Sequence, residues 1–169
     1  MATKTLERYP KDGPKDVIKV RGFFRLHIVD PDGTIRGDSG WMKNQVVNLG
    51  FNQYLVSGLG AIAGSKQVSF VALGSGTVPG AAATGITGEV AKRQSLTAAT
   101  SSGSKTLRAT ATFSSSDSFL AGTSNLSNLG LVNNQFSSDA HTIFGGNTFA
   151  SSSCATNQNV NVTYDIIFS

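Results

Sequence analysis

The segment 159–168 alternates its side chains more strictly than any other part of the chain. One set is Val160, Val162, Tyr164, Ile166 and Phe168, and the other is Asn159, Asn161, Thr163, Asp165 and Ile167. A period of two places successive side chains on opposite faces of a strand, so that one set can face a core while the other faces water. The pattern predicts a long β-strand and constrains the chain to a fold built on sheets.

Shorter segments with the same alternation, or with many β-branched and aromatic residues, predict further strands. They cover residues 18–29, 34–36, 68–73, 105–113, 126–132 and 141–150. Pro31, Asp32 and Gly33 predict a tight turn after the first of them, because Pro fixes φ and Gly accepts a positive φ. Six to eight strands with one short α-helix predict an all-β fold, a β-sandwich or jelly-roll-like domain.

One segment has helical spacing. Its apolar stripe consists of Val47, Phe51, Tyr54 and Leu55, at i, i+4, i+7 and i+8. We expect a short amphipathic helix over residues 44–58 that Asn44 caps at its start. Residues 89–93 are expected to form a helical turn before the next strand.

The first 16 residues differ in composition from the rest. They contain Pro10, Gly13 and Pro14 and few large apolar side chains, so residues 1–16 are expected to be an extended N-terminal arm. Residues 17–169 are then expected to be a single β-sandwich domain, because a chain of 169 residues fits one domain. The one cysteine, Cys154, cannot form an internal disulfide, so packing or assembly must stabilise the fold.

The charge distribution narrows the classes of partner. Charged residues make up 14% of the chain and the net charge is +4. The positive charges crowd into the first 25 residues, where acidic residues interrupt them, which makes nucleic acid an unlikely partner. No apolar run has the length of a membrane helix and no signal peptide is visible, so we expect synthesis in the cytosol and no membrane contact.

Residues that could carry chemistry are scarce. His27 and His141 are the only candidate bases of a hydrolytic triad, and the chain has no G-x-S-x-G nucleophile motif. Cys154 lies in a Ser-rich stretch with nothing nearby to lower its pKa. We therefore expect a non-enzymatic protein with no catalytic residues, no cofactor and no metal.

Three further features have ordinary structural interpretations. The segment 74–76 lacks the rest of a phosphate-binding motif and is interpreted as a turn that needs small residues. Asp30 and Asp32 flank a turn but lack the other ligands of a Ca²⁺ loop. Trp41 is interpreted as a core anchor between a strand and the helix, with a ligand contact as the alternative.

The order of these motifs resembles a family of small tailed-bacteriophage virion proteins associated with heads, tails and fibres. The matching segments are 40–50, 71–79, the pair Glu89 and Arg93, and then 127–133, 143–149 and 160–168. The resemblance covers about Phe24 to Ser169, and it implies a structural component of a virus particle. Asn128 stands where the family usually has Glu, and Gly145-Gly146 where it tends to have Ala-Arg.

Three functions are weighed on this basis. The first is a capsid decoration or cement protein that binds and stabilises the lattice of the major capsid protein, with its arm across a neighbouring subunit. The second is a tail, collar or fibre-associated subunit. The third is a carbohydrate-binding module that uses Tyr9, Trp41 or Tyr54. For the first two we expect location in the virion and a homo-oligomer, with a trimer as one option, and Arg8, Tyr9 and Arg21 are the expected interface residues.

Overall fold

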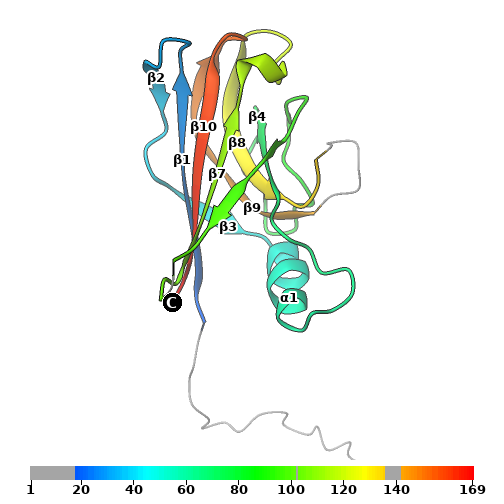
Figure 1. The fold of residues 1–169 in the computed structure, drawn as a ribbon. Coiled ribbons are helices and arrows are strands. Elements are labelled where there is room, and N and C mark those ends of the chain that lie inside the picture. The colour runs from blue at the N-terminus through cyan, green and yellow to red at the C-terminus, as the bar shows by residue number, and fades with distance from the viewer. Residues whose placement is uncertain (1–17, 102, 136–141) are drawn as a thin grey trace, which may run out of the picture.

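The computed structural model describes residues 18–101, 103–135 and 142–169 (Figure 1). The arm predicted for residues 1–16 lies outside the described residues, so the division into arm and domain stays a prediction. The described part contains ten strands, which pair antiparallel. They are β1 (Val20–Val29), β2 (Ile35–Asp38), β3 (Met42–Val46), β4 (Phe70–Gly74), β5 (Gln94–Ser95), β6 (Thr97–Ala99), β7 (Thr106–Phe113), β8 (Ser124–Val132), β9 (Ile143–Cys154) and β10 (Asn159–Phe168).

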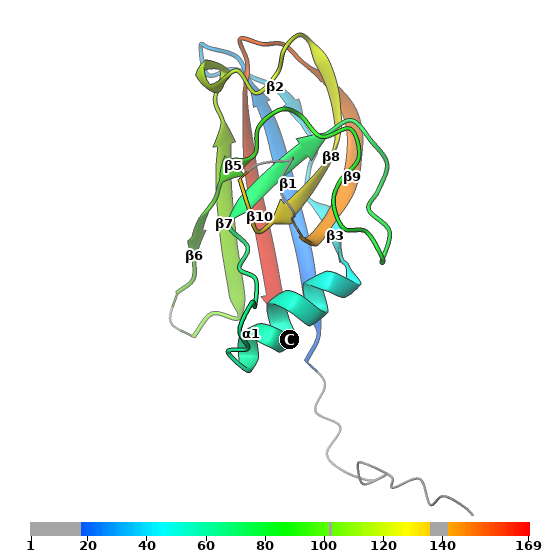
Figure 2. The same cartoon turned by 90° about the vertical axis from the view of Figure 1, so that its right-hand side faces the viewer.

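The strands form two layers that are joined at both sides (Figures 1 and 2). Their order is β5-β4-β8-β9-β3-β1-β10-β7-β6, with β2 beside β1. On one side β3 switches layers, because Met42–Asn44 pair with β1 while Gln45 and Val46 pair with β9. On the other side β5 and β6 are separated only by Leu96 and pair with opposite layers. The result is a nearly closed sandwich, which confirms the predicted all-β fold class.

Aromatic side chains connect the two layers in the core. Phe24 of β1 stacks on Tyr164 of β10 with ring centroids 6.3 Å apart, and it meets the ring of Phe149 from β9 edge-on. These three rings are nearly or fully buried. The inward residues of β1, β7 and β10 are the apolar sets of the predicted alternation, so the sequence period determines which face of each strand packs.

The helix begins later than predicted. Residues 48–59 are helical, with a π-helical stretch at Gly50–Val56 (η1) that continues into α1 (Ser57–Leu59). Asn44 lies in β3, so its predicted role as helix cap is wrong. The neighbouring strands β1 and β9 both bond to this segment, and that pairing overrides the local helical spacing.

The helical turn predicted over residues 89–93 is also absent from the structure. Glu89 instead forms an isolated β-bridge with Gly74, and the backbone runs on without a helix into β5. The side chains of Glu89 and Arg93 nevertheless meet, because the bend at residue 91 brings both to one side.

The two departures from the family motifs occupy crowded positions. A Cβ atom added to Gly145 would lie 2.6 Å from the carbonyl oxygen of Gln45, and one on Gly146 would lie 2.5 Å from that of Leu129. The fully buried Asn128 donates its amide to the carbonyl oxygens of Thr77 and Thr87, each at 3.1 Å. These residues hold β3 and the loop after β4 against β8 and β9.

Candidate interaction surface

The helix lies below the strands, at one end of the sandwich (Figures 1 and 2). Side chains of the helix and of the strand ends line an apolar groove there. It has a volume of about 460 Å³. Its apolar walls are formed by Ile18, Val20, Phe51, Leu55, Leu59 and Phe168. Tyr54 and Gly58 complete the lining, so no charged side chain faces the groove.

The strand wall of the groove follows from the sheet register. Val20 and Phe168 are directly paired across β1 and β10, at the first and last positions of the two strands. The ladder continues past them, because Lys19 N–H donates to Ser169 O at 2.7 Å and Ser169 N–H donates back at 2.9 Å. Ile18, two residues before Val20, therefore extends the apolar face of β1 beyond the end of the sheet.

The helical wall follows from residue spacing. Phe51, Leu55 and Leu59 are four residues apart and lie on one side of the helix, facing the ends of β1 and β10. Below them, the buried Tyr54 packs edge-on against Phe144, with ring centroids 5.5 Å apart, and donates its hydroxyl to Thr142 O. Burial raises the pKa of Tyr54 to about 12, so the groove floor is neutral at physiological pH.

Much of this apolar lining faces solvent. The exposed fraction is 75% for Ile18, 45% for Phe51 and 87% for Leu59. Val56 and Ile62 add further exposed apolar surface on and just after the helix. Contiguous apolar surface of this kind usually marks a place where another chain or ligand binds, whereas isolated exposed apolar residues are common on any protein.

The predicted interface residues lie only partly within the described chain. Arg8 and Tyr9 are outside the described residues. Arg21 is exposed on β1, and its guanidinium donates to Ser169 Oγ at 3.3 Å. Because side chains alternate along a strand, Arg21 points to the opposite face from Val20 and borders the groove without lining it.

The groove residues themselves were not singled out from the sequence as an interface. Phe51 belongs to the apolar stripe predicted for the helix, but it is about half exposed, while Tyr54 of the same stripe is buried. The available signal in the sequence was Leu59, which continues the four-residue spacing of Phe51 and Leu55. This row gives the helix more apolar surface than the one core beside it can cover.

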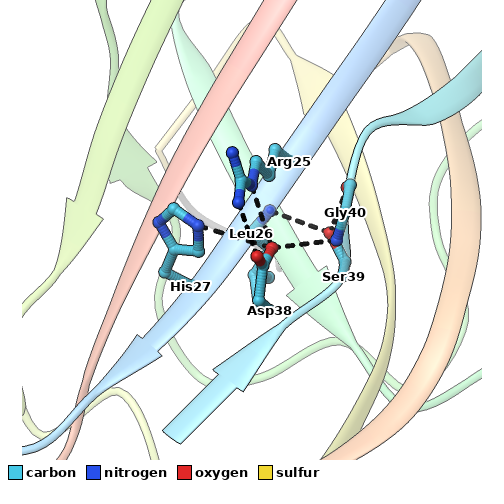
Figure 3. Close-up of polar contacts among 6 residues, drawn as sticks. All are labelled: Arg25, Leu26, His27, Asp38, Ser39 and Gly40. Atoms are coloured by element: carbon cyan, nitrogen blue, oxygen red, sulfur yellow. Dashed lines mark hydrogen bonds and ion pairs between the residues drawn. The ribbon is translucent and has the colours of Figure 1, made fainter. Parts of the chain in front are cut away.

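The outer face of β1 carries the most concentrated polar cluster (Figure 3). Arg25 donates to both carboxylate oxygens of Asp38, at 2.9 and 2.5 Å, which joins β1 to the end of β2. His27 Nε2 approaches Asp38 Oδ1 at 3.4 Å without forming a hydrogen bond. The guanidinium of Arg25, followed by the N–H of Gly40, holds the pKa of Asp38 well below its usual range.

A serine next to this cluster does not complete a triad. The Ser39 hydroxyl accepts from Leu26 N–H at 2.9 Å and donates to Gly40 O at 2.9 Å (Figure 3). A nucleophile must share a hydrogen bond with its base. The cluster is better explained as a polar clasp that fixes the chain between β2 and β3 against β1.

The remaining candidates from the sequence have structural roles where they are described. Cys154 is buried, and desolvation raises the pKa of its thiol to about 11, opposite to what a nucleophile needs. A Cβ atom added to Gly76 would lie 1.8 Å from Thr87 Oγ1, so the segment 74–76 does need small residues. Within the described ranges no three His, Cys, Asp or Glu side chains are grouped as metal ligands, and His141 is not described.

Two aromatic residues differ from their sequence interpretations. Trp41 is 49% exposed, so the prediction that it anchors the core is wrong. It lies in the short bend between the clasp and β3, where neither layer covers it. Tyr54 is buried beneath the groove and presents no face to a glycan. Of the described aromatic residues named in the carbohydrate hypothesis, Trp41 is the one that is exposed.

Comparison with protein-family models, curated proteins and solved structures finds no match to this chain. Among the described residues, no helix is both long and apolar enough to span a membrane. The groove is thus the feature of the described residues that points most directly to a function.

Proposed function

We propose that this chain is a non-enzymatic structural subunit of a tailed-phage virion. In this proposal it is a capsid decoration or cement protein that binds and stabilises the lattice of the major capsid protein. It acts as a homo-oligomer, and the end that carries the groove is the attachment end. A tail, collar or fibre-associated position is the alternative within the same class.

The observation that carries the proposal is the apolar groove at one end of the sandwich. Protein interfaces concentrate their binding energy in a few apolar and aromatic side chains that a polar rim surrounds. Phe51, Leu59 and Phe168 provide such side chains. An interface of this type suits a protein that works by attachment.

The motif resemblance supports the choice of a virion as the assembly. The segments 40–50 and 71–79 form β3 with its approach to the helix, and β4 with the loop that follows it. Both segments belong to the part of the sandwich that supports the helix and the groove. The net charge of +4 adds support if the capsid surface is acidic, because opposite charges speed and orient association.

The test is reassembly on particles from which this chain has been removed. Wild-type protein, Phe51→Asp and the matched control Val78→Asp are added back, and bound copies are quantified on purified particles. Phe51 and Val78 are both 45% exposed, but only Phe51 lines the groove. We expect occupancy to fall at least tenfold for Phe51→Asp and to stay at the wild-type level for Val78→Asp.

A second variant addresses the N-terminal arm. Deletion of residues 1–16 is expected to leave the sandwich folded, as judged by circular dichroism, and to reduce incorporation. Equal occupancy of all variants would contradict the attachment role of this end. Recovery of the protein with separated tails instead of heads would favour the tail alternative.

A further inference from the structure

We propose that the groove is the docking site for the N-terminal segment of the same chain, with Leu6 and Tyr9 as the side chains that fill it. The inference rests on the groove and on the sequence of residues 1–17. It concerns the isolated protein, in which the segment covers the groove until attachment to another chain displaces it, and it applies whether or not the chain is a virion component.

The chemistry of the groove selects an apolar occupant. Its volume of about 460 Å³ is within the range of pockets that hold small ligands or a few side chains. None of the lining residues is charged, and the Tyr54 hydroxyl is already bonded to Thr142 O. An ion or a strongly polar group would lose its hydration there without gaining a partner.

The position of the groove selects the N-terminal segment among apolar occupants. Ile18, the first described residue, is itself part of the groove wall. Residues 1–17 are therefore attached at the edge of the site. A short tether of this kind gives an effective concentration in the millimolar range, well above that of a free partner chain.

The sequence of the segment is compatible with this route. Its large apolar residues are Met1, Leu6, Tyr9 and Val17, and the sequence between Tyr9 and Ile18 contains Gly13-Pro14. These two residues favour a turn, which is required if the chain is to reverse and pass back along the helix. The charged residues Glu7 and Arg8 lie between Leu6 and Tyr9 in the sequence and can stay in water.

The reach of the segment is sufficient. Tyr9 lies nine positions before Ile18, and this stretch spans about 30 Å in extended form. The helical wall from Phe51 to Leu59 is about 12 Å long, from the rise of a helix. The segment can therefore travel outward, turn near Gly13, and still place Leu6 and Tyr9 against this wall.

Limited trypsin digestion of the full-length protein tests the docking. The measured quantity is the rate of cleavage after Arg8, which precedes Tyr9. We expect Phe51→Asp to increase this rate about tenfold and Val78→Asp to leave it unchanged. Equal rates in all three proteins would overturn the proposal, as would wild-type protection that disappears on dilution, because that result indicates the segment of another copy.

A disulfide trap gives an independent measurement. Tyr9→Cys combined with Leu59→Cys is expected to form an intramolecular disulfide rapidly, since the native Cys154 is buried and does not compete. The control pairs Tyr9→Cys with Gly122→Cys, an exposed position two residues before β8 with open space around it. Position 122 precedes the pairing of Ser124 with Cys154, which lies at the opposite end of the sandwich from the pairing of Val20 with Phe168. Cross-linking at equal rates in both proteins, or only between chains, would overturn the proposal.

Discussion

Arg93 and Glu89 form a bidentate ion pair beneath the surface of the sandwich. Nε of Arg93 donates to Oε1 of Glu89 at 2.5 Å, and its second amino group donates to Oε2 at 3.0 Å. The Arg93 side chain is fully buried, and Asn134 accepts from the remaining amino group through its backbone and side-chain oxygens. Glu89 therefore neutralises the charge of the arginine.

Glu89→Gln is therefore expected to destabilise the fold. It removes the negative charge of Glu89 from the buried guanidinium, and breaking comparable buried pairs costs about 3 kcal/mol. Urea unfolding at pH 7 measures the change in the free energy of unfolding. Arg36→Gln is the control, because the exposed Arg36 pairs with Asp30 at the surface and its loss should cost about 0–1 kcal/mol. Equal effects of the two substitutions would contradict this account.

Two glycines of the helix are expected to respond oppositely to alanine. A Cβ atom on Gly50 would lie 2.0 Å from the backbone oxygen of Phe144, which cannot move without shifting β9. A Cβ atom on Gly58 meets open space. Gly50→Ala should lower the free energy of unfolding by at least about 2 kcal/mol, whereas Gly58→Ala should raise it by about 0.5–1 kcal/mol. Thermal unfolding distinguishes them, and a stable Gly50→Ala protein would show that β9 packs less closely on the helix.

Two buried tyrosines differ in what their hydroxyl groups contribute. The hydroxyl of Tyr164 is buried without a hydrogen-bond partner among the described residues, while that of Tyr54 donates to Thr142 O. Tyr164→Phe should leave stability unchanged or raise it by up to about 1 kcal/mol, and Tyr54→Phe should lower it by about 1 kcal/mol. Denaturant titrations of both proteins provide the comparison. A large loss for Tyr164→Phe would indicate a partner for that hydroxyl.

The clasp on β1 predicts how stability depends on acid. The pKa of Asp38 is lowered in the folded state, first by the hydrogen bond from Arg25 and then by that from Gly40. Its charged form therefore contributes stability above the ordinary carboxyl pKa of about 4, and this contribution is lost as the pH falls through the lower folded value. Asp38→Asn should flatten the decline in stability below pH 4, measured as urea midpoints. An unchanged slope would exclude Asp38 as a main source of acid sensitivity.

The strands of the sheet were predictable where the alternation of side chains along the sequence determines which of them are buried. The alternation of Val160 to Phe168 determined both the existence of β10 and its buried face, because one face meets the core along the whole strand. β3 was missed because its pairing comes from β1 and β9, which are distant in sequence. Asn44 has the chemistry of a helix cap, but hydrogen bonding within the sheet decided its conformation.

The interaction surface was less predictable than the fold. The arm prediction pointed to the N-terminal end of the chain, and Arg21 does border the groove there. The groove, however, depends on how the helix is oriented against the ends of β1 and β10. That orientation makes Leu59 exposed and Tyr54 buried, although both are apolar residues on the same short helix. Residue spacing shows that the helix has more than one apolar row, but it does not show which row faces the core.

The most direct test of the central claim is a cryo-EM reconstruction of intact virus particles from the source of this chain. The account predicts many copies of the sandwich on the capsid shell, with Phe51 and Leu59 at the end that faces the lattice. Copies found only at the tail would instead support the alternative, a tail, collar or fibre-associated subunit. Particles that lack the chain altogether would contradict the proposal that it is a virion subunit.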